Sequence, residues 1–166
     1  MPFGEFIPFG FRWFTALMNI PLGDFNRGPL AAPSFAAFGE RIAPNICYED
    51  LFGEELIDML PEATVLLNVS NDAWFGRSFA AEQHLQASQM RSLEAGRWMV
   101  RSTNTGATAA IDERGRIVSR LPQFTHGALV QAVQPRSGTT PFVRWGNHAA
   151  VLICAAIVFA VRVRRA

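Results

Sequence analysis

The chain has 166 residues, enough for one domain with a hydrophobic core and too few for two. Apolar residues make up 49% of it, charged residues only 17%, and the formal net charge is +1. A charge this small excludes an electrostatic case for binding nucleic acid, while the low charged content favours a protein that contacts a membrane or a large interface. All 15 basic residues are arginine, because the chain contains no lysine.

The order of the elements predicts a layered α/β domain. The first forty or so residues are rich in Pro, Gly and Phe and read as loops with an unusually apolar surface. Alternating strands and helices follow, recognised by apolar spacing and by stop signals such as Pro61. The expected elements are strand Arg41–Ile46, helix Glu49–Leu60, strand Thr64–Val69, helix Ala80–Ala95, strand Met99–Thr103, a hairpin of Ala107–Ile111 with Arg116–Arg120, and strand Leu129–Val133.

The C-terminal residues differ from the rest in composition. Ala149–Val161 is an uncharged apolar run, preceded by Trp145 and followed by three arginines. A bilayer span usually needs about 20 apolar residues, so the run is short, but Trp at one end and Arg at the other favour a transmembrane helix over a buried soluble one. We therefore expect a domain over residues 1–144, a transmembrane helix over 145–163 and a cytoplasmic tail of 164–166, with the domain on the outer side of the membrane.

Cys47 is the strongest candidate for chemistry. It stands where a predicted strand passes into a predicted helix, with Glu49 two residues on. Such an elbow presents a nucleophile beside unpaired backbone N–H groups, which can hold an oxyanion and favour a thiolate. A buried structural cysteine is the alternative. Cys154 lies in the apolar run and reads as a small hydrophobe; no spacing suggests a disulfide or a metal site.

Several strings around Cys47 resemble a known family. Ile46-Cys47-Tyr48-Glu49, followed by Asn71-Asp72-Ala73-Trp74-Phe75-Gly76, resembles the nitrilase superfamily. Longer strings, in the same order and over essentially the whole chain, resemble the apolipoprotein N-acyltransferases of that superfamily. They are Pro2–Glu5, Asn68–Gly76, Gln83–Gln86, Met90–Glu94, Arg101–Gly106 and Gly138–Phe142.

The resemblance implies a fold and an activity. The fold is the C-terminal part of a nitrilase-like α/β/β/α sandwich on the outer, periplasmic side of the bacterial cytoplasmic (inner) membrane. The activity is acyl transfer by a Glu–Lys–Cys triad, without a cofactor or metal. The cysteine attacks a phospholipid ester and forms a thioester. The acyl chain then passes to the N-terminal amine of the diacylglyceryl-cysteine of an apolipoprotein.

The same resemblance assigns roles to residues of this chain. Cys47 is the nucleophile, and Tyr48 and Glu49 are the neighbours that the family also needs. Glu5 matches an acidic residue around the active site, and Trp74 and Phe75 match a mobile, lipid-facing loop. Without the family, Glu5 reads as a solvated carboxylate, and Trp74 and Phe75 read as core aromatics.

The chain also departs from the family pattern. The resemblance places the triad Lys and Glu upstream of Met1, and no lysine is present to take the first role. We therefore expect the chain alone to be inactive. An inert membrane-anchored remnant and a soluble nitrilase-type amidohydrolase remain as alternatives. His84 is expected to be a surface or packing residue of its helix, and Glu94 to pair with Arg97.

Overall fold

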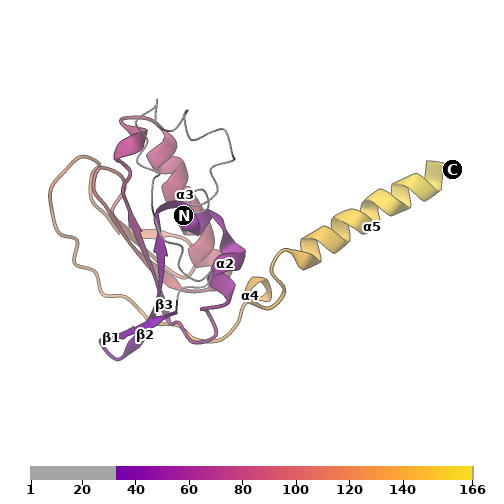
Figure 1. Ribbon diagram of the computed structural model, residues 1–166, viewed down its shortest axis with the longest axis horizontal. Coiled ribbons are helices and arrows are strands. Elements are labelled where there is room, and N and C mark those ends of the chain that lie inside the picture. Colours follow the sequence, from indigo (N-terminus) through magenta and orange to yellow (C-terminus); the bar gives the residue numbers. More distant parts are fainter. Residues whose placement is uncertain (1–32, 166) are drawn as a thin grey trace, which may run out of the picture.

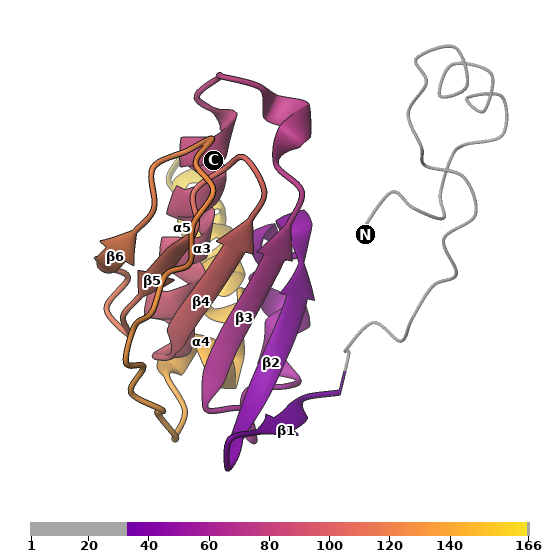
Figure 2. The same cartoon turned by 90° about the vertical axis from the view of Figure 1, so that its left-hand side faces the viewer.

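A computed structural model describes residues 33–165, which form one sheet, a layer of helices and a projecting C-terminal helix (Figures 1 and 2). The α/β class predicted from the sequence is confirmed. The elements are β1 (Phe35–Ala37), β2 (Glu40–Ile46), η1 (Cys47–Leu51), α2 (Gly53–Ile57), β3 (Val65–Ser70), η2 (Ala73–Phe75), α3 (Ala80–Ala95), β4 (Trp98–Thr103), β5 (Ala109–Ile111), β6 (Ile117–Arg120), α4 (Pro141–Trp145) and α5 (His148–Arg165).

The sheet places its strands in chain order from β1 to β6. The middle strands β2, β3 and β4 are parallel, and the other pairs are antiparallel. Parallel neighbours need a crossover connection, which is why helical segments separate these three strands in the sequence. The predicted hairpin is confirmed as β5 and β6, which turn at Gly115, a residue with φ +73°.

One face of the sheet carries the helices and the hydrophobic core, as Figure 2 shows with α3 and α4 behind the strands. α3 has the predicted bounds and ends at Gly96, whose φ of +62° suits glycine. The core joins buried strand residues to buried residues of the helices and their connections: Ala43, Leu66, Met99, Ala109 and Ile111 from the strands, and Leu56, Met59, Leu60, Ala63, Leu85, Ala95, Ala107 and Val143 from the rest.

The opposite face of the sheet is only partly covered. Pro44, Leu67 and Val100 are half-buried, while Ile46 is 55% and Val69 is 41% exposed. Alternate residues of a strand point to opposite faces, so this face is apolar by sequence as well as by structure. A sheet that is apolar on both faces is typical of one covered by a further layer on each side.

Two predicted elements differ in the structure. The expected helix Glu49–Leu60 is divided into η1 and α2, because Phe52 has non-helical φ and ψ of −103° and 80°. The expected strand Leu129–Val133 lies in an extended connection without strand pairing, and Val130 is exposed. Its apolar composition is typical of a strand, but no neighbouring strand is aligned to complete its hydrogen bonds.

α5 projects away from the domain, as Figure 1 shows, and the side chains of residues 148–164 are exposed. Among residues 33–165, no helix is both long enough and apolar enough to cross a lipid bilayer. The predicted transmembrane helix over 145–163 is therefore not confirmed, and neither is the cytoplasmic tail that depended on it. Trp145 belongs to α4, Gly146 has φ +53° and separates the two helices, and arginines occupy the last turn of α5.

Candidate active site

The three parallel strands end at one edge of the sheet, and the candidate residues follow those ends. Cys47 comes directly after β2, Asn71 and Asp72 follow β3, and Asn104 follows β4. In open α/β sheets, ligands bind outside the carboxyl ends of the parallel strands. This edge is therefore the place where the fold favours an active site.

Cys47 forms the elbow that the sequence predicted. It is the first residue of η1 and has φ +56°, a left-handed conformation that non-glycine residues rarely adopt. The side chain is half-buried and the thiol is free. A strained residue at a strand-to-helix turn costs on the order of 1–3 kcal/mol, and it is characteristic of nucleophile elbows, where the strain exposes the reactive side chain.

Polar side chains hold the backbone on both sides of this elbow. The Cys47 carbonyl oxygen accepts a hydrogen bond from Asn68 Nδ2 at 2.7 Å, and His84 Nε2 lies 3.2 Å from it. The Ile46 N–H donates to Glu49 Oε2 at 2.6 Å. The elbow conformation is therefore fixed by contacts from β3 and α3 as well as by η1 itself.

Beneath the elbow lies a group of four buried ionisable side chains, Asp50, Asp72, His84 and Arg101, which we call the charge cluster. Arg101 bridges the two carboxylates, with Nη1 3.2 Å from Asp50 Oδ2 and Nη2 3.1 Å from Asp72 Oδ2. The imidazole lies between the same two groups, with Nε2 3.1 Å from Asp50 Oδ1 and Nδ1 3.2 Å from Asp72 Oδ1. The Ser88 hydroxyl also donates to Asp50.

The carboxylates set the protonation of this cluster. Burial alone lowers the pKa of His84, but hydrogen bonds with Asp50 and Asp72 outweigh it and raise the pKa to about 9. Burial raises the pKa of Asp72, whereas hydrogen bonds from His84 and Ser70 and the charge of Arg101 bring it to about 2. The two carboxylates of the cluster therefore face its two basic side chains at close range, as buried ionisable groups require.

The loops after β3 and β4 are tied together at the same edge. Asn104 accepts from the Asp72 N–H at 3.0 Å and donates to Asn71 Oδ1 at 2.7 Å. Gly106 is packed so closely on this junction that a Cβ there would lie 2.0 Å from Asp72 Oδ2. Only glycine leaves room for the Asp72 carboxylate at this point.

Trp74 and Phe75, the two aromatic residues predicted to face lipid, differ in their burial. Trp74 is 61% exposed, and Phe75 is half-buried with its ring edge-on to His84, the centroids 6.1 Å apart. Phe79, which ends the same loop, is exposed as well. Phe75 thus contacts the charge cluster, and Trp74 faces solvent.

Of the predicted catalytic residues, the structure brings Cys47 and Glu49 together at the elbow. Tyr48 lies between them in η1, and Glu5 falls outside the described residues. Of the two interpretations of His84, a surface residue is wrong, because the side chain is buried; it also makes polar contacts through both ring nitrogens, which were not predicted. Glu94 pairs with Arg91, at 3.1 Å, and not with Arg97 as expected.

Asp50 and Arg101 were not predicted from the sequence as residues of the site. Arg101 could have been found, because it is a charged residue in the middle of the apolar strand prediction Met99–Thr103. Such a residue needs a buried partner of opposite charge.

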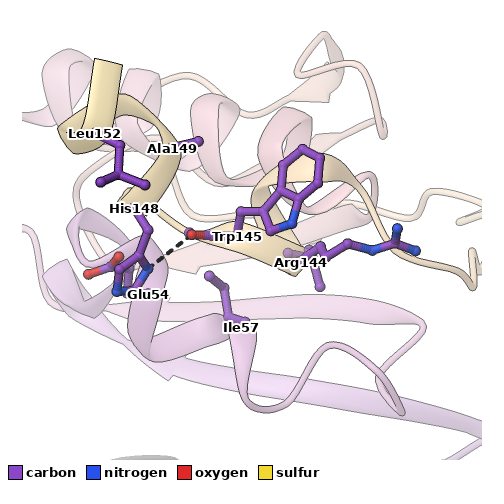
Figure 3. Close-up of a pocket in the computed structure, with 9 residues that line it drawn as sticks. Glu54, Ile57, Arg144, Trp145, His148, Ala149 and Leu152 are labelled. Atoms are coloured by element: carbon purple, nitrogen blue, oxygen red, sulfur yellow. Dashed lines mark hydrogen bonds between the residues drawn. The ribbon is translucent and has the colours of Figure 1, made fainter. Parts of the chain in front are cut away.

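A cavity of about 780 Å³ lies away from this edge, between α2, α4 and the start of α5 (Figure 3). His148 Nδ1 lies 3.0 Å from the Trp145 carbonyl oxygen, and Glu54 Oε1 accepts from the Asn147 N–H at 3.0 Å. The lining residues are Glu54, Ile57, Val143, Arg144, Trp145, Gly146, His148, Ala149 and Leu152. None of them belongs to the elbow or the charge cluster. Within residues 33–165, no group of three or more His, Cys, Asp or Glu side chains could hold a metal ion.

Comparisons with known proteins agree with this geometry. Residues 9–141 match the carbon-nitrogen hydrolase family. An apolipoprotein N-acyltransferase from Ralstonia nicotianae is 54% identical over 99% of this chain and 32% of its own length. One from Nitrosomonas europaea is 55% identical over 89% of this chain and 30% of its own. The chain thus spans about a third of the length of these curated relatives.

Solved structures share the fold at low sequence identity. A carbon-nitrogen hydrolase from Helicobacter pylori G27 matches 60% of this chain and 42% of its own, with TM-score 0.54 and 10% identity. A variant amidase from Nesterenkonia sp. AN1, with an acetamide moiety added covalently at its active-site cysteine, matches 60% and 40%, with TM-score 0.51 and 16% identity.

Proposed function

Because this chain belongs to the carbon-nitrogen hydrolase family and resembles its apolipoprotein N-acyltransferases, we propose that it carries the nucleophile of such an acyltransferase. The enzyme would move an acyl chain from a phospholipid to the N-terminal amine of the diacylglyceryl-cysteine of an apolipoprotein. The observation that carries this proposal is the left-handed Cys47 at the carboxyl edge of three parallel strands.

The reaction would proceed in two transfers. In the first, Cys47 Sγ bonds to the ester carbonyl carbon, the ester C–O bond breaks, and the thiol proton leaves with the lysophospholipid alcohol. In the second, the lipoprotein amine attacks the thioester, an amide forms, and the thiol is restored. Each transfer passes through an oxyanion, which backbone N–H groups in the first turn after Cys47 are suited to stabilise.

We assign Glu49 to shaping the elbow, since its carboxylate accepts from the Ile46 N–H. For Tyr48 we propose the supporting place beside the nucleophile that the resemblance implies, and for Glu5 a place around the active site. The chain contains no lysine, so the cation of the Glu–Lys–Cys triad must come from elsewhere. We therefore propose that the 166 residues alone do not acylate, because the loss of a base or an oxyanion partner costs several kcal/mol of transition-state stabilisation.

The partners of the proposed enzyme include a membrane. α5 presents exposed apolar side chains such as Leu152, Ile157 and Phe159, and exposed Trp74 lies in the loop after β3. Apolar side chains of this size are suited to contact acyl chains. We propose that the domain lies on the outer side of a bacterial cytoplasmic membrane and receives both lipid substrates there.

The proposed fold of the whole enzyme is the α/β/β/α sandwich. The described residues supply one helical layer and one sheet, and the other face of that sheet is apolar and partly exposed at Ile46 and Val69. A second sheet packed about 10 Å away would bury this face. We propose that this sheet, with the remaining triad groups, is supplied by sequence that corresponds to the other two thirds of the relatives.

The experiment joins this chain to the N-terminal two thirds of the Ralstonia nicotianae relative. The purified protein is incubated in detergent with phospholipid and a diacylated lipopeptide, and mass spectrometry follows the thioester on Cys47 and the triacylated product. C47A should lose both, and C154A is the matched control that should retain both. Undiminished product from C47A would remove Cys47 from the mechanism.

The two alternatives predict different products from the same protein. An amidohydrolase would release ammonia from small amides and give no triacylated lipopeptide. An inert remnant would give neither product, even with the joined segment present. The likeness to the Nesterenkonia amidase, at 16% identity, establishes the fold alone.

A further inference from the structure

His84 belongs to the charge cluster and also contacts the backbone of Cys47, with Nε2 3.2 Å from the carbonyl oxygen. We infer that His84 is a positioning residue for Cys47: its Nε2–H donates to the Cys47 carbonyl, and Asp50, Asp72 and Arg101 hold the ring in that orientation. The inference rests on the proposed function only in taking Cys47 as the nucleophile.

The first step is the direction of the Cys47–Tyr48 peptide. The described backbone contains no cis peptide bond, so the carbonyl of Cys47 and the N–H of residue 48 point in opposite directions. His84 and Asn68 hold that carbonyl towards the buried side of the sheet. The N–H of residue 48 is therefore turned away from the charge cluster, where it is free to face an oxyanion formed at Cys47.

The second step is the orientation of the imidazole. Nε2 has two acceptors within 3.2 Å, Asp50 Oδ1 and the Cys47 carbonyl oxygen, so a proton on Nε2 is favoured in every protonation state. Nδ1 faces the Asp72 carboxylate at 3.2 Å and Arg101 Nη2 at 2.7 Å. It can therefore donate to the carboxylate when charged or accept from the guanidinium when neutral.

The third step is the rigidity of the support. All four members of the charge cluster are at least 95% buried, and their ion pairs cross from η1 and α3 to β4 and to the loop after β3. Both Nη groups of Arg101, both carboxylates and both ring nitrogens have partners, and paired polar groups in a low-dielectric interior favour one geometry. A reaction that depends on the position of an oxyanion donor is sensitive to shifts below 1 Å.

The test compares two variants with the same loss of charge. H84Q keeps an amide donor near the position of Nε2, whereas H84F removes the donor. H126F is the control, because it makes the same His-to-Phe change at an exposed histidine. Two rates are measured at Cys47 in the joined enzyme. One is alkylation by iodoacetamide, which forms no oxyanion, and the other is acyl loading from phospholipid, which does.

We expect H84F to lower acyl loading at least tenfold while alkylation changes less than twofold, and H84Q and H126F to stay within threefold in both rates. Equal losses in the two rates with H84F would indicate a merely structural role and overturn the inference. So would equal effects of H84Q and H84F on acyl loading, because the donor would then not be the property that matters.

A second measurement needs neither a variant nor enzymatic activity. The ¹⁵N shifts of the imidazole in the 166-residue chain identify which ring nitrogen carries a proton at pH 7. A proton on Nε2 supports the inference, and a neutral ring protonated on Nδ1 alone overturns it. Absence of acyl loading in the unaltered joined enzyme would contradict the proposed function and leave this measurement to decide the role of His84.

Discussion

Two arginines at β4 are buried on the same side of the sheet. Arg97, directly before the strand, is 2% exposed, and Arg101, within it, is 0% exposed. The guanidinium of Arg97 is surrounded by neutral acceptors and donates to the carbonyls of Ala63, Leu60 and Gly138 at 2.8, 3.2 and 2.7 Å. That of Arg101 meets the carboxylates of Asp50 and Asp72 and a histidine.

The two arginines therefore have different kinds of partners. At the Arg97 end, one guanidinium donates to five backbone carbonyls and connects the turn after α2 to the segment before α4. Burial lowers the pKa of this guanidinium. At the Arg101 end, a charged cluster supports a strained cysteine. A buried cluster of ion pairs contributes more to a defined geometry than to stability, so its placement next to Cys47 indicates a functional use.

The largest effect is expected from removing the guanidinium of the charge cluster. R101M leaves Asp50 and Asp72 buried with only His84 between them, and breaking a buried pair typically costs about 3–5 kcal/mol. Chemical denaturation of the purified chain would measure the loss of unfolding free energy. A loss below about 1 kcal/mol would show that the carboxylates do not need this partner.

The pH dependence of stability tests the same cluster without a mutation. The pKa of His84 is raised from 6.5 in the unfolded chain to about 9, so its contribution is fully present below about 6.5 and is lost as pH rises through 9. At 1.36 kcal/mol per unit, the loss is on the order of 3 kcal/mol. Denaturation between pH 6 and 10 should show this decline, and H84Q should flatten it.

At acidic pH the contribution of Asp72 to stability is lost as the pH falls, which is the opposite direction from that of His84. The pKa of Asp72 is lowered from 3.8 to about 2, so its contribution is present above 3.8 and is lost as pH falls through 2. The expected loss is smaller than that of His84, because the shift is smaller. A D72N variant should show no such loss over this pH range, measured by the same denaturation.

Replacing Arg97 is expected to cost less unfolding free energy than replacing Arg101. R97M removes hydrogen bonds from five carbonyls, two of them long at 3.4 Å, but leaves no carboxylate without its partner, so we expect a loss of about 2 kcal/mol of unfolding free energy. The measurement is the same denaturation, in parallel with R101M. If R97M proved as costly as R101M, the carboxylates of the charge cluster would not explain the difference between the two ends.

Much of the fold could be predicted because its signals are local. The helical spacing and terminal Gly96 gave the bounds of α3, and the β-branched run gave β3. The charge cluster could not be predicted in the same way, because Asp50, Asp72, His84 and Arg101 come from four separate segments. Their contacts depend on strand register and helix placement, which no spacing rule supplies. Likewise, the uncharged run Ala149–Val161 favoured a membrane span, but no helix among residues 33–165 is both long enough and apolar enough to be one.

The smallest effect is expected in the loop after β3, where Trp74 and Phe75 are adjacent but packed differently. F75A removes a ring that lies edge-on to His84 and should cost about 1 kcal/mol of stability. W74A removes a side chain that is 61% exposed and should change stability by less than about 0.5 kcal/mol. The proposed lipid-facing role predicts that W74A nevertheless slows acyl loading in the joined enzyme, with W145A, at a similarly exposed Trp, as the matched control. A large loss of stability with unchanged loading per folded molecule would assign Trp74 to the core instead.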